Sequence, residues 1–249
     1  MVFNPSKGVL LIHGLTGTPA NLEPLQNRLQ TAGLTTLTPL LEGHQSVAVL
    51  NRTPWEQWFQ TVLDSFEALS QKCDEVHCCG LSLGSLLALK LASSVGPRLK
   101  SVALLGLPLR LDPWYDRFLI PLFRYSPLQF FVASVPKNFE KSVADPQGVA
   151  IYRRTSLDRM PVHAVLELKK LARHLHPLLS HIIQPILAIH AQNDPIASPQ
   201  SLKILERALP HHRLETLILK RSRHVVTLDY EKDLVSETVL DFFRRQGGT

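Results

Sequence analysis

The stretch Gly80-Leu81-Ser82-Leu83-Gly84 decides the fold of this chain. It follows Val76-His77-Cys78-Cys79, which has the composition of a short buried strand, and it precedes a run of helix-forming residues at 85–92. A serine between two glycines at a strand-to-helix junction predicts a sharp turn, because a side chain at either glycine would collide across it. Such a turn lifts the hydroxyl above the sheet, so Ser82 is the candidate nucleophile.

The segments around this turn alternate between the two regular structures. We expect strands at 8–12, 35–39, 76–79, 99–105, 185–190 and 213–219, and helices at 20–31, 54–70, 83–94, 199–208 and 232–245. This alternation predicts the α/β class, with a mostly parallel sheet and helices on both of its faces. Residues 107–180 interrupt the alternation, so we expect them to form a separate insertion into the α/β unit.

A serine hydroxyl needs a base before it can act as a nucleophile. Asp194 follows the strand at 185–190, and His224 follows the strand at 213–219, so each lies just past the carboxyl end of a strand, as Ser82 does. Ligands of open parallel sheets bind at that edge. We therefore expect His224 to take the Ser82 proton and return it to the leaving group, and Asp194 to hold the imidazole.

Two other carboxylates lie closer to His224 in the sequence. Asp229 and Glu231 precede the last predicted helix, and we expect them to begin it, where negative charge favours the helix dipole. We therefore prefer Asp194 as the acid.

The loop after the first strand, His13-Gly14-Leu15-Thr16-Gly17, is the candidate partner of the turn at Ser82. Its glycines allow the backbone to approach a ligand closely. A tetrahedral intermediate needs hydrogen-bond donors for its oxyanion, and we expect the backbone N–H groups of Leu15 and Leu83 to supply them. Gly14 and Leu15 are then expected to contact substrate, while His13 is expected to be hydrogen-bonded beneath the loop.

Five short segments together resemble the small bacterial carboxylesterases of the α/β-hydrolase superfamily, the group close to monoacylglycerol lipases. These segments are HGLTG at 13–17, EGH at 42–44, GLSLG at 80–84, NDP at 193–195 and HVVTLDYEKD at 224–233. The resemblance implies an α/β-hydrolase fold and a serine esterase without a metal or an organic cofactor. It maps nucleophile, acid and base to Ser82, Asp194 and His224, and the oxyanion donors to Leu15 and Leu83.

The chain departs from that group at two positions. Ser85 stands where a second glycine is usual after Gly84, and we expect the helix packing to survive because serine is small. Arg223 stands where a glycine usually precedes the catalytic histidine. An arginine there would either crowd the mouth of the pocket or supply a positive charge to substrate, so Arg223 is a candidate substrate-binding residue.

The resemblance also implies that the insertion is a small helical cap over Ser82. We expect residues 1–106 and 181–249 to form the hydrolase core and residues 107–180 to form this cap, with a helix near 161–176. The cap is rich in aromatic residues: Trp114, Tyr115, Phe118, Phe123, Tyr125, Phe130 and Phe131. They either line an apolar substrate pocket or only hold the cap on the core.

Composition limits the remaining possibilities. The 249 residues fit one α/β domain, and no stretch approaches the 18 uninterrupted apolar residues of a membrane span. We expect a cytoplasmic protein without stable membrane insertion, although transient lipid contact stays open, and we make no prediction of oligomeric state. The net charge of +6 comes from scattered lysines and arginines without a nucleic-acid motif, so we expect a small ester substrate and no nucleic-acid partner.

Neither the cysteines nor the histidines indicate a further cofactor. Three cysteines do not make a disulfide framework, and a reducing compartment fits them. The histidines at 174, 176, 181, 211 and 212 lack the spacing of a zinc site, so no metal is expected. Trp55 and Trp58 share one helix face and are expected in the core, and His44 is expected to bond within its own loop.

Three functions remain open on these grounds. The first is hydrolysis of carboxylic esters with short to medium acyl chains, monoacylglycerols among them, through an acyl-enzyme on Ser82. The second is thioester hydrolysis or acyl transfer with the same residues, because the nucleophile chemistry is shared. The third is a hydrolase-like module that binds without catalysis.

Overall fold

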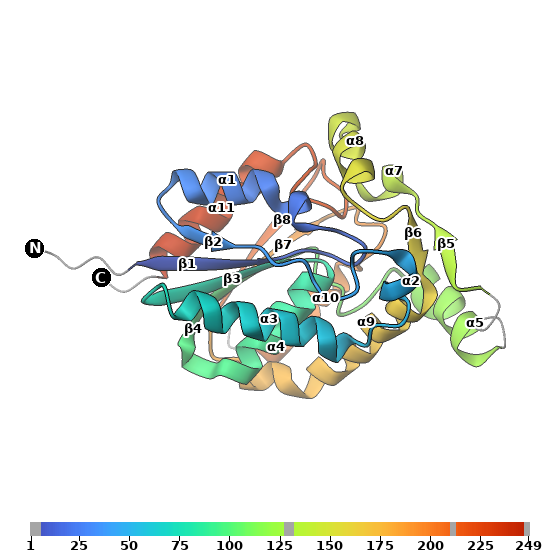
Figure 1. Cartoon of the computed structure of the whole chain (residues 1–249), viewed down its shortest axis with the longest axis horizontal. Coiled ribbons are helices and arrows are strands. Elements are labelled where there is room, and N and C mark those ends of the chain that lie inside the picture. The colour runs from blue at the N-terminus through green and yellow to red at the C-terminus, as the bar shows by residue number, and fades with distance from the viewer. Residues whose placement is uncertain (1–5, 127–131, 210–212, 247–249) are drawn as a thin grey trace, which may run out of the picture.

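The computed structural model describes residues 6–126, 132–209 and 213–246, and within these ranges a six-stranded parallel sheet forms the centre of the molecule (Figure 1). Its strand order is β2-β1-β3-β4-β7-β8. The strands are β1 (Lys7–Ile12), β2 (Thr35–Leu37), β3 (Glu75–Leu81), β4 (Leu99–Leu105), β7 (Ile186–Ala191) and β8 (Leu214–Leu219). The α/β class and the parallel sheet predicted from the alternating segments are confirmed.

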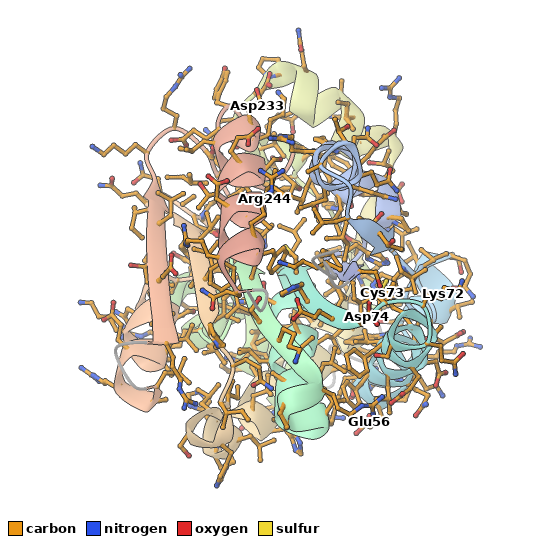
Figure 2. All side chains as sticks on the ribbon, turned by 90° about the vertical axis from the view of Figure 1, so that its left-hand side faces the viewer. Glu56, Lys72, Cys73, Asp74, Asp233 and Arg244 are labelled. Carbon is orange, nitrogen blue, oxygen red and sulfur yellow. The ribbon has the colours of Figure 1, made fainter. Side chains whose placement is uncertain are left out.

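Helices cover both faces of the sheet. Helices α1 (Glu23–Thr31) and α11 (Lys232–Arg245) pack on one face, whereas α3 (Trp55–Ser70) and α4 (Leu83–Val95) pack on the other. Figure 2, viewed from the left of Figure 1, shows α11 between its labelled residues Asp233 and Arg244, well away from the labels of Glu56 and Lys72 near the ends of α3. Shorter elements complete this part of the chain: η1 (Pro19–Leu22), α2 (Val47–Leu50), η2 (Gly96–Arg98) and α10 (Gln200–Ala208).

The sheet separates two hydrophobic cores, because successive residues of a strand point to opposite faces. On β1, Val9 and Leu11 belong to the core under α1 and α11, whereas Leu10 and Ile12 belong to the core under α3 and α4. Phe242 of α11 is fully buried in the first of these cores. The helix predicted at 232–245 is confirmed.

The two tryptophans of α3 lie on the core side of that helix, as predicted. Trp58 is fully buried, and Trp55 is partly buried against the same core. The Trp55 ring also packs on His174 of α9 (Val162–Leu175), with 5.2 Å between the ring centroids. This contact joins α3 to the segment that returns from the insertion.

The insertion lies beyond the carboxyl ends of the strands (Figure 1). It contains the π-helical turn η3 (Tyr115–Leu119), α5 (Ile120–Tyr125), β5 (Ser134–Pro136), α7 (Phe139–Ser142), α8 (Pro146–Arg154), β6 (Arg159–Pro161), α9 (Val162–Leu175) and η4 (His176–His181). Strands β5 and β6 pair antiparallel, a feature that the expectation of a small helical cap did not include. Both strands have three residues and end in proline, so neither shows the alternation of a strand in sequence.

Helix α9 also belongs to the core beneath it. Leu171 and Leu175 are fully buried in the same hydrophobic core as α3 and α4, while Val162 and Val165 at its start face the cavity described below. The boundary between core and cap near residue 180 therefore stays a prediction. None of the helices in the described ranges combines the length and apolar character that crossing a membrane requires.

Candidate active site

Ser82 lies at the turn between β3 and α4, in a backbone conformation that non-glycine residues rarely adopt. Its φ is 54° and its ψ is −115°. A Cβ atom on Gly80 would collide with the backbone of Gly84, and a Cβ atom on Gly84 would collide with the carbonyl of Ile12. Only glycine fits at both positions, so the tight turn predicted from the two glycines is present.

Ser85, which follows Gly84 in α4, supports this turn. Its Oγ lies 2.6 Å from the carbonyl oxygen of Gly80 and accepts a hydrogen bond of 3.1 Å from the N–H of Leu105 on β4. The Ser82 N–H donates to the carbonyl of Leu105 at 2.8 Å. Ser85 therefore preserves the packing of α4, as expected. It also ties the turn at Ser82 to β4, the neighbouring strand.

The side chains of Ser82, His224 and Asp194 form one continuous hydrogen-bonded line. Ser82 Oγ lies 2.7 Å from His224 Nε2, and His224 Nδ1 lies 2.7 Å from Asp194 Oδ2. The three residues are separated by 112 and 30 positions and meet because β3, β7 and β8 run in the same direction in one sheet. This is the geometry of a Ser-His-Asp triad, in which the imidazole can accept the serine proton while the carboxylate stabilises the resulting cation.

Asp194 is held as a carboxylate by its surroundings. Its burial opposes ionisation, but the charge and hydrogen bond of His224 outweigh this cost, and the pKa of Asp194 lies below its ordinary value. Its other oxygen accepts hydrogen bonds from the N–H groups of Ile196 at 2.8 Å and Ala197 at 2.9 Å. His190 on β7 lies 3.7 Å from the carboxylate, and burial lowers the pKa of that imidazole, which favours its neutral form.

Glu231 lies at the start of the last helix, as expected, and Asp229 lies two positions before it, but the side chains of both also bind the loop that carries His224. Glu231 immediately precedes α11, but its carboxylate accepts hydrogen bonds from three successive backbone N–H groups, residues 220–222. Asp229 is fully buried, and its carboxylate accepts a hydrogen bond of 2.7 Å from the N–H of Arg223. Both carboxylates therefore fix the loop that carries His224.

The loop after β1 approaches Ser82 closely. A Cβ atom on Gly14 would lie 3.3 Å from the Ser82 Cβ, so a side chain there would crowd the serine. Gly14 and Leu15 both line the cavity above Ser82. Thr16 has a φ of 62°, and its carbonyl accepts a hydrogen bond of 2.8 Å from the N–H of Leu157 in the cap.

His13 is hydrogen-bonded beneath this loop and His44 bonds within its own loop, both as expected. His13 Nδ1 lies 2.9 Å from the carbonyl oxygen of Gly14, and its Nε2 accepts a hydrogen bond of 3.1 Å from the N–H of Leu41. His44 Nδ1 lies 3.2 Å from the carbonyl oxygen of Glu42. Burial lowers the pKa of His13 to about 3 and that of His44 to about 4, so both rings stay neutral.

A cavity of about 560 Å³ opens between Ser82 and the cap. This volume is within the range of small-molecule sites. Most of its wall is apolar and comes from the insertion: Leu111, Trp114, Tyr115, Ile120, Phe123, Met160, Val162, Val165, Leu166 and Leu168. The pocket can therefore accept a hydrocarbon chain next to the serine hydroxyl.

The predicted cap aromatics divide into two groups. Trp114, Tyr115 and Phe123 line the cavity, whereas Phe118 and Tyr125 are exposed at 66% and 79%. Phe130 and Phe131, like His211 and His212, lie outside the described residues. The aliphatic wall of β6 and α9 was not predicted, because its residues are indistinguishable in sequence from a helix face buried in the core.

Arg223 does not line the cavity within the described residues. Its guanidinium contacts the backbone carbonyl of Glu140 on α7, and the side chain is exposed at the surface. The contact joins the loop of His224 to the cap. We expect Arg223 to contact substrate on sequence grounds, and this stays a prediction. Its position outside the cavity lining does not support it.

Gly106, at the end of β4, was not recognised in sequence. Its φ is +60°, and a Cβ atom there would lie 3.3 Å from His224 Nδ1 and 3.1 Å from the His224 carbonyl oxygen. This glycine therefore leaves room for the imidazole.

Within the described ranges, no group of three or more His, Cys, Asp or Glu side chains is placed to hold a metal ion.

Known proteins with the same architecture are similar to this chain over nearly its whole length. A monoacylglycerol lipase of Bacillus sp. (strain H-257), described as thermostable, is 26% identical over 98% of this chain and 93% of its own length. A carboxylesterase of Bacillus subtilis (strain 168) is 27% identical over 96% of this chain and 93% of its own length. A structure from work on two metagenome-derived lipolytic enzymes, LipS and LipT, superposes with a TM-score of 0.85 at 25% identity, covering 97% of this chain and 96% of the other.

The family described as serine aminopeptidase S33 matches residues 4–231, which includes the turn at Ser82, the turn at Asp194 and the loop of His224. The match therefore contains all three members of the hydrogen-bonded line as well as the whole sheet. On this match and the shared fold, the chain is an α/β-hydrolase enzyme and belongs to the serine aminopeptidase S33 family.

Proposed function

We propose that this protein hydrolyses carboxylic esters with short to medium acyl chains, monoacylglycerols among them, through an acyl-enzyme on Ser82. His224 accepts the Ser82 proton as the hydroxyl attacks the ester carbonyl, and then gives it to the leaving alcohol. Water then attacks the acyl carbonyl and loses a proton to the same imidazole, which passes it to Ser82 Oγ as the acyl–Oγ bond breaks and the acid leaves. Asp194 holds the imidazole in the tautomer that this sequence requires.

One observation carries this proposal: the serine that lies 2.7 Å from a carboxylate-bound imidazole opens onto a cavity with an apolar wall. The nucleophile and its base are within proton-transfer distance before substrate binds. The wall offers burial to an acyl chain, which favours esters of fatty acids over polar substrates. The names of the two Bacillus relatives support the same class of substrate.

The oxyanion of the tetrahedral intermediate would be held by the N–H groups of Leu15 and Leu83. Leu83 is the first residue of α4, and N–H groups of a first helical turn have no acceptor within the helix. Leu15 lies on the loop that lines the cavity beside Ser82. Donors already fixed in place stabilise the developing charge without reorganisation.

The family description includes aminopeptidases, but the cavity favours esters. An aminopeptidase must hold the free ammonium group of its substrate, and a carboxylate is the natural partner for that charge. Among the described residues that line this cavity, none is an aspartate or a glutamate. We therefore propose ester rather than peptide hydrolysis for this member of the family.

Thioester hydrolysis and acyl transfer would use the same serine, base and acid. They differ only in the leaving group or in the molecule that takes the acyl group from Ser82. Partition of the acyl-enzyme between water and added alcohols separates hydrolysis from transfer. We expect free acid to be the main product at low alcohol concentration.

The experiment that tests the proposal combines covalent labelling with an ester panel. A fluorophosphonate should form one adduct, on Ser82, and labelling should disappear in Ser82→Ala. Esters of graded chain length should show a maximum of kcat/KM at short to medium chains. A protein that neither forms the adduct nor turns over any ester would instead be a binding module.

We also propose a cytoplasmic location, on the evidence of the thiols. Cys73, Cys78 and Cys79 are free and buried. Unpaired cysteines are typical of reducing compartments. Mass spectrometry of thiols alkylated under denaturing conditions, after rapid quenching of cells, would test whether they stay reduced in the cell.

A further inference from the structure

The cavity above Ser82 has a basic side, which its described lining residues identify. Among its described lining residues, the lysines are Lys137 and Lys141, and neither an aspartate nor a glutamate accompanies them. Both come from the short segment that connects β5 with α7 and continues into that helix. The apolar wall comes mainly from α5 and α9, which lie on the other side of the cap from α7 and α8 (Figure 1). The cavity is therefore amphipathic, with a hydrocarbon side and a basic side.

The ammonium group of Lys137 has one polar and two aromatic contacts, and no described carboxylate pairs with it. Its Nζ donates a hydrogen bond of 2.9 Å to Oγ1 of Thr16, which belongs to the loop proposed to hold the oxyanion. It also lies 3.9 Å from the centre of the Tyr152 ring and 5.0 Å from that of Phe139. Within the described residues, Lys137 forms no ion pair with a carboxylate. Burial lowers the pKa of Lys137 to about 7, as expected for a cation that lacks an anionic partner.

The nearest acidic side chain on this segment is already engaged elsewhere. Glu140 forms an ion pair of 2.5 Å with Arg153 on α8, and both side chains are exposed. Lys141 donates a hydrogen bond of 3.0 Å to the Tyr115 hydroxyl, which holds its ammonium at the cavity. Among the described lining residues no carboxylate neutralises the two lysines, so an anionic ligand would complete this end of the cavity.

We propose that the substrate is a single-chain acyl ester whose alcohol part carries an anionic group. The acyl chain lies against the apolar wall, the ester carbonyl lies at Ser82, and the anion binds Lys137 and Lys141. This inference rests on the proposed esterase function and names the substrate class of the same site. Hydrogen bonds between ammonium and anionic oxygens are about twice as strong as neutral ones, so the two lysines determine specificity.

A pair of soluble substrates tests this inference. We would compare 1-hexanoylglycerol with 1-hexanoylglycerol 3-phosphate, which share the acyl chain and the ester bond and differ in charge. The wild-type protein should hydrolyse the phosphate-bearing ester with a kcat/KM at least equal to that of the neutral ester. This preference should decrease as NaCl is raised, because salt screens the attraction.

Variants test whether the two lysines cause the preference for the phosphate-bearing ester. Lys137→Gln should lower kcat/KM for the phosphate-bearing ester about tenfold more than for the neutral ester. Lys137→Arg retains the positive charge and should keep most of the preference. Lys141→Gln removes the second positive charge of the cavity, at an exposed position. Lys203→Gln on α10 removes the same charge outside the cavity and should leave the ratio of the two kcat/KM values unchanged.

The outcomes separate this inference from the function on which it rests. If neither ester is cleaved and Ser82 forms no fluorophosphonate adduct, the esterase proposal fails. If the neutral ester is cleaved but the phosphate-bearing one is ten times poorer, only the inference about the anion fails. An equal loss of kcat/KM for both esters in Lys137→Gln would show that the lysine only supports the loop at Thr16.

Discussion

The carboxylate of Asp229 accepts a hydrogen bond of 2.7 Å from the backbone N–H of Arg223, the residue immediately before His224. The same carboxylate accepts bonds of 2.9 Å from the N–H groups of Ala144 and Asp145 in the cap. One buried anion thus joins the loop of the proposed catalytic base to the segment between α7 and α8. The position of the imidazole and the position of the cap depend on the same side chain.

Asp229→Asn should therefore weaken both the fold and the proposed activity. The amide keeps one acceptor oxygen, but its NH2 group would face backbone donors that then lose their partner inside the protein. We expect the free energy of unfolding to fall by about 3 kcal/mol, the scale of one or two lost hydrogen bonds to a charged group. Urea denaturation measures this loss, and kcat for an ester should fall because His224 is less well held.

Glu231→Gln is the matched control for that change. Glu231 also binds backbone N–H groups of the same loop, but it is only partly buried, so water can replace a lost bond. We expect a loss of about 1 kcal/mol. Equal losses of stability in the two variants would contradict the special role given to Asp229.

Gly106→Ala should impair His224 through contact as well as through backbone strain. The new Cβ would lie 3.3 Å from the imidazole Nδ1, which is itself bonded to Asp194. Gly96→Ala is a close control, because its φ of +55° nearly equals the +60° of Gly106 and nothing lies within 4 Å of its added Cβ. Both variants should lose about 1 kcal/mol of stability to strain.

Only Gly106→Ala should also lower kcat, by about tenfold or more, since small displacements of a catalytic group are costly. Steady-state kinetics on one ester, together with thermal unfolding of each variant, gives the comparison. The same kcat in both variants would mean that the imidazole tolerates the added methyl group.

The fold and the three central residues could be predicted because each has a local cause in the sequence. Gly80 and Gly84 make the turn at Ser82 recognisable, since only glycine fits there. Asp194 and His224 each follow an apolar run of strand length, and the carboxyl ends of parallel strands meet at one edge. Local patterns of this kind determine which edge of the sheet carries the chemistry.

The supporting residues could not be predicted, because their roles arise from contacts between distant segments. Asp229 looks like the start of a helix until residues 144 and 145 are seen to bond to it. The importance of Gly106 depends on His224, which is 118 positions away. Lys137 is one of many lysines in a basic chain, and only its burial next to Thr16 and Tyr152 distinguishes it.

Asp194→Asn should remove most of the proposed activity while leaving the fold largely intact. The N–H groups of Ile196 and Ala197 need an acceptor, so the asparagine oxygen should stay on their side and its NH2 group should face His224 Nδ1. The imidazole would then carry its proton on Nε2 and could not accept one from Ser82. We expect kcat to fall about 10⁴-fold.

The kinetics of Asp194→Asn should be accompanied by unfolding curves and by fluorophosphonate labelling. Slow labelling of a stably folded variant is the expected combination. A variant with near wild-type kcat would mean that another group orients the imidazole of His224. His190 lies 3.7 Å from the Asp194 carboxylate, but it could not replace that carboxylate because it is not an acid.

Three buried histidines should make the protein less stable in mild acid. His13, His44 and His77 are at most 1% exposed, and burial lowers their pKa values to about 3, 4 and 4. In the unfolded chain a histidine titrates near its ordinary pKa of about 6.5, so between these values the unfolded state binds more protons. The stabilising contribution is therefore complete above about pH 6.5 and is lost as the pH falls toward the folded-state values.

His77 offers the cleanest test, because it packs against Phe243 and bonds to Ser101 at 2.8 Å, outside the proposed active site. The free energy of unfolding of the wild type, measured in urea between pH 4 and 7, should fall with decreasing pH. His77→Gln should make this dependence shallower by up to about 1 kcal/mol per pH unit, since one protonation is removed from the unfolded state. Because the comparison uses the slope, a constant loss of stability from the substitution itself does not affect it. Equal slopes would show that His77 has similar proton affinity in the folded and unfolded chains, which would contradict the effect assigned to its burial.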